Sequence, residues 1–216
     1  MKLVLAAAVL ALAGCPVAYI LWPRWPDQVS VDAPALPITV GGLTFNVPPA
    51  AIRIPMQRRA GAQERIDLAF LWPSLAPPDP ATKPVQGETP PHLERIFLTI
   101  AINDGTPPPV ERLKTIYPRY TAGAPTSGSD GLTIQAFRND TPYNGEDLLY
   151  EPNAPERFLL RCTRTGGNAA GVCLHQRRIA NADLTVRFPR EWLTDWRSVA
   201  DNIDRLIATL RPIGAK

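Results

Sequence analysis

Proline is the feature that most limits how this chain can fold, because 25 of its 216 residues are prolines. A proline removes a backbone hydrogen-bond donor and breaks the interior of a helix, so a chain this rich in proline has many loops and few long helices. About 180 residues follow Pro37, which is enough for one domain with a substantial core. We therefore expect a single domain built mainly from short strands.

Runs of alternating apolar and polar residues predict the strands. In residues 65–73 and 94–102 the apolar side chains fall on one face of each strand. Gly41 and Gly42 separate two shorter runs, and a two-residue Gly-Gly turn is a strong signal of a β-hairpin. Further strands are expected at 131–138, 146–152, 157–164, 171–179 and 184–188. Together these runs predict a mainly antiparallel sheet of about seven to nine strands.

Two stretches have helical patterns. Residues 106–117 predict a short helix with Pro109 in its first turn. Residues 190–211 carry apolar residues at intervals of three and four, which predicts a long amphipathic helix between Pro189 and Pro212. Such a helix must bury its apolar side. The expected fold class is therefore α+β, a mainly antiparallel β-sheet with one short helix and a long C-terminal amphipathic helix packed on the sheet.

The N-terminal segment decides where such a domain is placed. From Leu3 to Trp22 there are twenty residues without a charged side chain, which is about the length that crosses a hydrocarbon core. The favoured prediction is an uncleaved anchor. It makes the chain a single-pass protein of the inner membrane with its domain in the periplasm.

Residues 12–15, LAGC, offer a second interpretation of this segment. They resemble the lipobox of bacterial lipoproteins, in which the cysteine becomes the lipid-carrying first residue of the mature chain. The resemblance implies an envelope protein that is lipid-anchored at Cys15. Residues 16–22 stay apolar, however, which favours burial in a bilayer over exposure after cleavage. A simple signal peptide with its cleavage site at residues 11–13 is the third alternative, and all three interpretations export the domain.

The chain is thus expected in three parts. Residues 1–22 form the membrane anchor or signal segment, residues 23–37 a proline-rich tether, and residues 38–216 a single exported α+β domain. Within the domain, residues 73–93 contain seven prolines. A connection of this length without secondary structure is uncommon and often functional, although a solvated excursion from a hairpin is the simpler interpretation.

Cys162 and Cys173 give the most specific site prediction. The turn at 165–171 lies between them, and a regular hairpin places them opposite each other within reach of a disulfide. An exported bacterial domain favours the oxidised pair. A redox role lacks the C-x-x-C spacing, and a metal site with His175 would have only three ligands where structural zinc takes four. We expect a structural disulfide, and neither a metal nor a cofactor.

Arginines cluster around the same hairpin. Arg161, Arg164, Arg177 and Arg178 form a candidate patch for an anionic partner, such as lipid head groups or an envelope polymer. The favoured alternative is a solvated strand surface that is balanced by neighbouring acidic residues. The net charge of +3 comes from interspersed acidic and basic residues, which argues against a nucleic-acid partner.

Known catalytic motifs are missing from the sequence, which contains no G-x-S-x-G, H-E-x-x-H, Walker or dinucleotide-binding pattern. Its only histidines are His92 and His175. We therefore expect an interaction or assembly module of the cell envelope rather than an enzyme, with the membrane and an unknown envelope protein or polymer as partners. The alternative is an envelope hydrolase or small-ligand binder with a site near the 73–93 loop. In the order of its elements the domain resembles the PsbP/DcrB-like envelope domains, a resemblance of architecture that implies no site residues.

Overall fold

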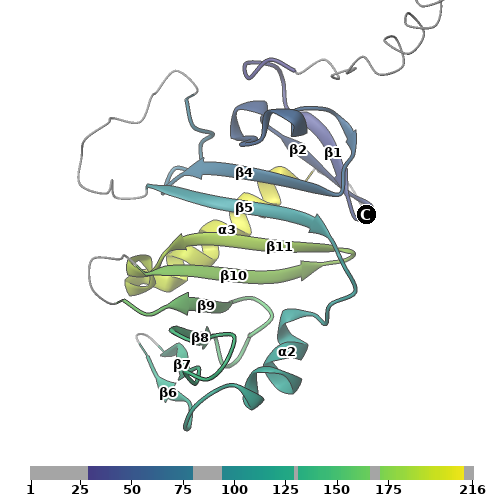
Figure 1. Ribbon diagram of the computed structural model, residues 1–216. Coiled ribbons are helices and arrows are strands. Elements are labelled where there is room, and N and C mark those ends of the chain that lie inside the picture. Colours follow the sequence, from purple (N-terminus) through teal and green to yellow (C-terminus); the bar gives the residue numbers. More distant parts are fainter. Residues whose placement is uncertain (1–28, 80–93, 129–130, 166–170, 212–216) are drawn as a thin grey trace, which may run out of the picture.

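The computed structural model describes residues 29–79, 94–128, 131–165 and 171–211. Eight strands form a large sheet: β4 (Arg65–Leu71), β5 (Arg95–Ile102), β6 (Thr126–Ser127), β7 (Thr133–Ala136), β8 (Glu146–Tyr150), β9 (Leu159–Thr163), β10 (Val172–Ile179) and β11 (Ala182–Pro189). Their order in the sheet is β4-β5-β11-β10-β9-β8-β7-β6 (Figure 1). Every neighbouring pair is antiparallel, so the predicted antiparallel sheet is confirmed.

A small sheet of three strands lies before the large one in the sequence. It consists of β1 (Leu36–Val40), β2 (Leu43–Val47) and β3 (Gly61–Ala62). The predicted Gly-Gly hairpin joins β1 to β2, and both glycines have positive φ angles, of 58° and 81°. A Cβ atom on Gly41 would lie 2.5 Å from the backbone oxygen of Asn181, so only glycine fits where this hairpin touches the β10–β11 turn.

The predicted helix over residues 190–211 is present in two parts. The first turns form a 3₁₀ helix, η5 (Arg190–Asp195), and the α-helix α3 (Trp196–Leu210) follows it. Asp195 has non-helical backbone angles, and its side chain accepts a hydrogen bond of 3.3 Å from the Ser198 N–H. This side chain is the N-cap that fixes where the α-helix begins.

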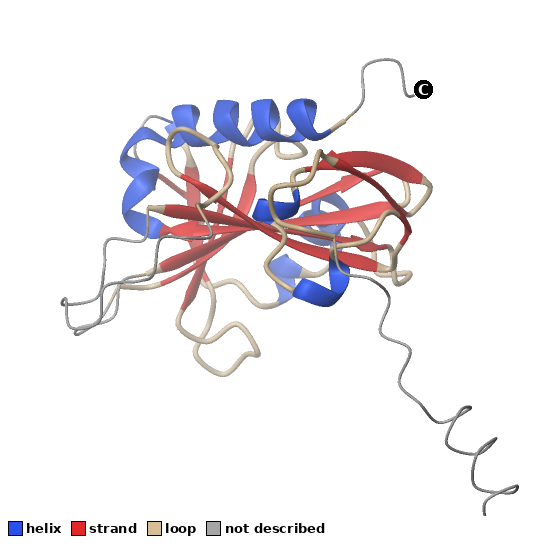
Figure 2. Ribbon diagram, turned by 90° about the horizontal axis from the view of Figure 1, so that it is seen from above, coloured by secondary structure: helices blue, strands red, loops and turns tan. Residues whose placement is uncertain are grey.

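Helix α3 covers one face of the large sheet, which we call the helix face, and Figure 2 shows it along one side of the strands. The apolar stripe of the helix is buried there, and the Trp196 ring stacks on Phe158 with 5.3 Å between ring centroids. The core of this face contains residues of the small sheet, the large sheet and α3. Examples are Ile38 of β1, Leu98 of β5 and Val186 of β11. The expected packing of the C-terminal helix on the sheet is therefore confirmed.

The opposite side of the large sheet, which we call the open face, is covered only at its ends within the described residues (Figure 1). At the end formed by β8 and β9, Tyr117 packs in a second core with Phe137, Leu148 and Leu159. At the β4 end, the Arg53 N–H donates a hydrogen bond of 2.9 Å to the Asp67 backbone oxygen. The remaining short helices of the described chain are η1 (Pro49–Ala51), η2 (Pro55–Gln57), α2 (Pro109–Thr115) and η3 (Tyr117–Arg119). Helix α2 contacts β10, so among the residues described only part of the middle strands β5, β11 and β10 is left without a covering helix.

The predicted N-terminal anchor or signal segment, residues 1–22 with Cys15, lies outside the described residues. So do residues 23–28 of the tether and residues 80–93 of the long loop. In the ranges that the structure does describe, no helix is long and apolar enough to span a bilayer. The three-part division of the chain stays a prediction.

Candidate functional site

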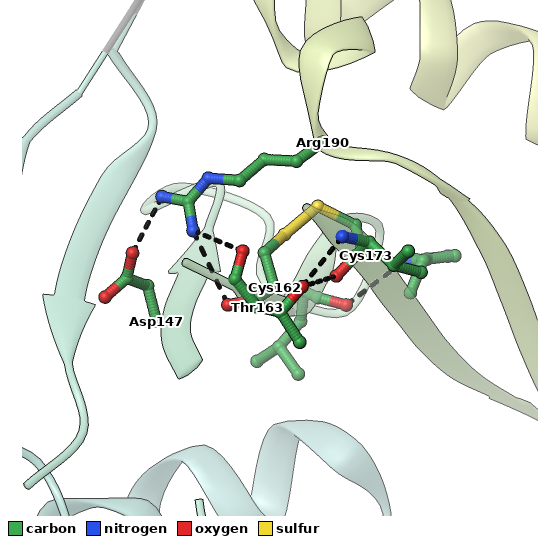
Figure 3. Close-up of a disulfide and its surroundings, with 8 residues drawn as sticks. Asp147, Cys162, Thr163, Cys173 and Arg190 are labelled. Atoms are coloured by element: carbon green, nitrogen blue, oxygen red, sulfur yellow. Dashed lines mark hydrogen bonds and ion pairs between the residues drawn. A yellow bond between two sulfur atoms is a disulfide. The ribbon is translucent and has the colours of Figure 1, made fainter. Parts of the chain in front are cut away.

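The predicted cysteine pair lies inside the core beneath α3. Cys162 on β9 and Cys173 on β10 are directly opposite each other, and their sulfur atoms form a disulfide (Figure 3). Both side chains are fully buried, and the bond closes a loop of 11 positions, which contributes about 3 kcal/mol on the chain-entropy model. A disulfide buried in this way is structural, and it leaves neither thiolate available for a metal site with His175.

An ionic network next to the disulfide holds the start of η5 against the sheet (Figure 3). Asp147 on β8 accepts hydrogen bonds from Arg190 Nη2 at 2.7 Å and from Arg164 Nε at 2.8 Å. Arg190 also donates to the backbone oxygen of Thr163 at 3.0 Å. These contacts tie residues distant in the sequence to the hairpin that carries the disulfide, so the network stabilises the fold.

The four arginines of the predicted anionic-partner patch are all ion-paired. The pairs are Arg161 with Glu146, Arg164 with Asp147, Arg177 with Asp204 and Arg178 with Asp183. The set is also divided between the two sides of the sheet, because Arg177 lies on the helix face whereas Arg161 and Arg178 lie on the open face. Binding of an anionic partner by this set stays a prediction, and its charges are already balanced inside the fold.

His175 is a core residue in the structure. It is fully buried, its Nδ1 atom lies 3.1 Å from the Leu159 backbone oxygen, and its ring stacks on Phe158. Burial lowers the pKa of His175 from 6.5 to about 4, so the ring is neutral near pH 7. This environment is that of a packing residue. His92, the other candidate base, lies outside the described residues.

The start of the 73–93 loop borders a cavity of about 280 Å³. Trp72 and Pro73 line one side of it, and Asp195 and Ser198 of the α3 N-terminus line the other. The Trp72 ring stacks on Trp192 with 4.5 Å between centroids. The described lining contains carboxylates and hydroxyl groups but no histidine, so it lacks the base that a serine–histidine hydrolase needs.

A surface that the sequence analysis missed lies on the open face around Phe97 of β5. Arg187 of β11 is the cross-strand partner of Phe97, and Arg95 precedes Phe97 by two residues on the same face. Arg53 reaches over β4 from its outer side, and its guanidinium carbon lies 4.7 Å from the centre of the Phe97 ring. We call Arg53, Arg95 and Arg187 the open-face arginines.

The open-face arginines have no carboxylate partner within the described part of the chain. The carboxylates that the strands carry on the same face are already paired: Asp67 with Arg65, Glu146 with Arg161 and Asp183 with Arg178. Burial alone would raise the pKa of Asp67, but hydrogen bonds from Arg65, Thr99 and Gln57 outweigh it and lower this pKa to about 2. Asp67 is therefore ionised and engaged by its neighbours, and no carboxylate among the described residues balances the charge of the three arginines.

Half-buried and exposed apolar groups accompany this charge. Phe97 and Leu174 are half-buried, and Leu174 is the cross-strand partner of Arg187 on β10. Ile54, next to Arg53 in the chain, is 42% exposed. At the other end of the same face, a polar cavity of about 290 Å³ lies beside α2. The open face thus has a basic, partly apolar end around Phe97.

Comparison with known proteins identifies a shared fold but does not assign the chain to a family. No protein-family model matches the chain, and no similar curated protein was found. Among solved structures, the chain is similar to Smlt3025, an immunity protein of the Stenotrophomonas maltophilia type IV secretion system. The likeness has a TM-score of 0.57 and 16% identity, over 83% of this chain and 94% of that one. It shows a shared fold across nearly the whole described domain.

A second solved structure, the Neisseria meningitidis iron-regulated outer membrane lipoprotein FrpD, is more distant. Its TM-score is 0.42 at 9% identity, over 84% of this chain and 100% of that one. This likeness is too weak to carry an argument about the present chain.

Proposed function

We propose that this chain is an exported protein-binding module of the bacterial envelope, and that it acts as an immunity-type protein. By this we mean that it works by occupying a surface of a partner protein instead of transforming a substrate. Residues 1–22 would hold the module at the inner membrane, with a lipid on Cys15 as the alternative anchor. The open face carries the proposal.

The composition of the open face is that of a protein-binding surface. The centres of protein interfaces are enriched in aromatic residues and arginine, and a few such side chains supply most of the binding energy. Here Phe97 lies among three arginines that have no carboxylate partner in the described ranges, and Leu174 and Ile54 are close to them. Among the residues described, α2 covers only part of the middle strands on this side and Arg187 is exposed, so a partner can reach the basic end of the open face.

Two further observations support the proposal. The fold shared with a secretion-system immunity protein supports a role in binding another protein. The buried disulfide is the kind of bond that persists in oxidising compartments such as the periplasm.

Site-specific photo-crosslinking in the native bacterium tests this function. Benzoylphenylalanine would replace Leu174 on the open face in one strain and Ala208, an exposed residue of α3, in the control strain. We expect an adduct of one discrete mass from position 174 and none from position 208. Mass spectrometry then identifies the partner. Absence of any adduct at position 174, or equal adducts at both positions, would contradict binding through the open face.

A further inference from the structure

We infer that the partner held by the open face presents an acidic protein surface, and that the open-face arginines recognise it. This inference rests on the proposed protein-binding function and adds the chemistry of the partner. Its basis is the contrast between these three arginines and the rest of the sheet, where the basic side chains have found carboxylates within the fold.

The geometry of the arginines is set by four neighbouring strand positions. Ala69 on β4, Phe97 on β5, Arg187 on β11 and Leu174 on β10 form one cross-strand row on the open face. Because Ala69 is small, the Arg53 side chain can pass over β4 and place its guanidinium on the Phe97 ring. This cation–π contact holds the group in place without neutralising its charge.

A carboxylate from outside would meet donors that are already positioned. A guanidinium offers a planar fork that binds a carboxylate through two hydrogen bonds, and charge-assisted bonds of this type are about twice as strong as neutral ones. The Phe97 ring lies between the arginines, so a partner that covers it also removes water from the ion pairs. The complementary surface therefore carries carboxylates around an apolar contact.

The number and setting of the arginines favour a protein over a lipid surface. Segments that bind anionic membranes use clusters of about four to eight basic residues. Three arginines around a half-buried aromatic ring are too few for such a cluster. They suit the small, mixed contact area of a protein interface, in which charge complementarity sets the association rate and the choice of partner.

The test compares crosslinking from position 174 in four versions of the full-length chain. These are the wild type, the double reversal Arg53→Glu with Arg187→Glu, the charge-preserving Arg53→Lys with Arg187→Lys, and a control reversal, Arg205→Glu, on the outer side of α3. We expect the adduct yield to fall about tenfold or more in the double reversal, and to fall clearly less, by about threefold, in the lysine variant, which keeps the charge but loses the planar fork. The control should match the wild type.

The outcomes separate the inference from the function on which it rests. No adduct in the wild type means that the proposed function fails. An undiminished adduct in the double reversal means that the open face binds a protein that is not acidic, so only the inference falls. In a parallel flotation assay, wild-type protein that prefers vesicles containing phosphatidylglycerol over vesicles of phosphatidylcholine, with the preference lost in the double reversal, would assign the arginines to lipid and overturn the inference.

Discussion

The helix face of the large sheet and the basic end of its open face use arginine in opposite ways, although Arg161 and Arg178 elsewhere on the open face are also ion-paired. On the helix face, Arg157 and Arg177 both pair with Asp204 of α3 and help to hold the helix on the strands. On the open face, Arg53 and Arg187 are exposed and have no carboxylate partner in the described chain. Paired charges help the domain to fold, whereas unpaired ones remain available to a partner. We therefore expect substitutions under the helix face to lower stability, and substitutions at the basic end of the open face to affect mainly the proposed binding.

The largest expected difference in unfolding free energy between the two faces comes from replacing one aromatic residue on each face by alanine. Trp196 is 2% exposed under α3 and stacks on Phe158, so Trp196→Ala should lower the free energy of unfolding by about 4 kcal/mol. Phe97 is half-buried on the open face, and Phe97→Ala should cost about 1 kcal/mol. Urea denaturation of the purified full-length variants measures both values. Similar losses of unfolding free energy at the two positions would contradict the expected difference between the faces.

The buried histidine of the helix face should have a smaller effect, which is a pH dependence of the unfolding free energy. The pKa of His175 is lowered from 6.5 to about 4, so the unfolded chain takes up a proton below pH 6.5 while the folded chain does not. The stabilisation is therefore complete above pH 6.5 and is lost as the pH falls toward 4, a loss of about 3 kcal/mol. Asp67 of the open face, with its pKa lowered from 3.8 to about 2, contributes only below that range, between pH 3.8 and 2.

Urea midpoints recorded at pH 7, 5.5 and 4 follow the His175 contribution without that of Asp67, because Asp67 titrates below this range. The variant His175→Gln cannot take up this proton and serves as the control. Its stability should change much less than that of the wild type between pH 6.5 and 4. If both proteins lose the same stability over this interval, the buried ring is not the group responsible.

The sequence predicted the strands and the disulfide because both depend on local patterns. Period-two alternation identified β4 and β5, and the register of one hairpin placed Cys162 opposite Cys173. The C-terminal helix was predicted as one element because Trp192 continues its apolar spacing. In the structure the α-helix begins only after Asp195, whose side chain caps it, and Trp192 lies in the preceding 3₁₀ turn.

Local sequence patterns could not predict the candidate site, because the site depends on contacts between residues that are distant in the sequence. Arg161 and Arg177 find their carboxylates 15 and 27 positions away, so the sequence could not show which arginines are neutralised. Arg53, Arg95 and Arg187 are far apart in the chain, and only the pairing of β4, β5 and β11 brings them around one ring. Closeness of arginines in the sequence therefore does not show which arginines lie together in space.

The smallest effect comes from removing one arginine on each face. Arg177 is only 30% exposed and pairs with Asp204, so Arg177→Ala should cost about 1 kcal/mol of unfolding free energy. Arg187→Ala, on the adjacent strand, should change it by less than about 0.5 kcal/mol. Repeating both substitutions in an Asp204→Ala background should abolish most of the Arg177 effect and leave the Arg187 effect unchanged. If Arg187→Ala lowers the unfolding free energy as much as Arg177→Ala does, Arg187 stabilises the fold. That result would contradict the proposal that the open face binds a partner.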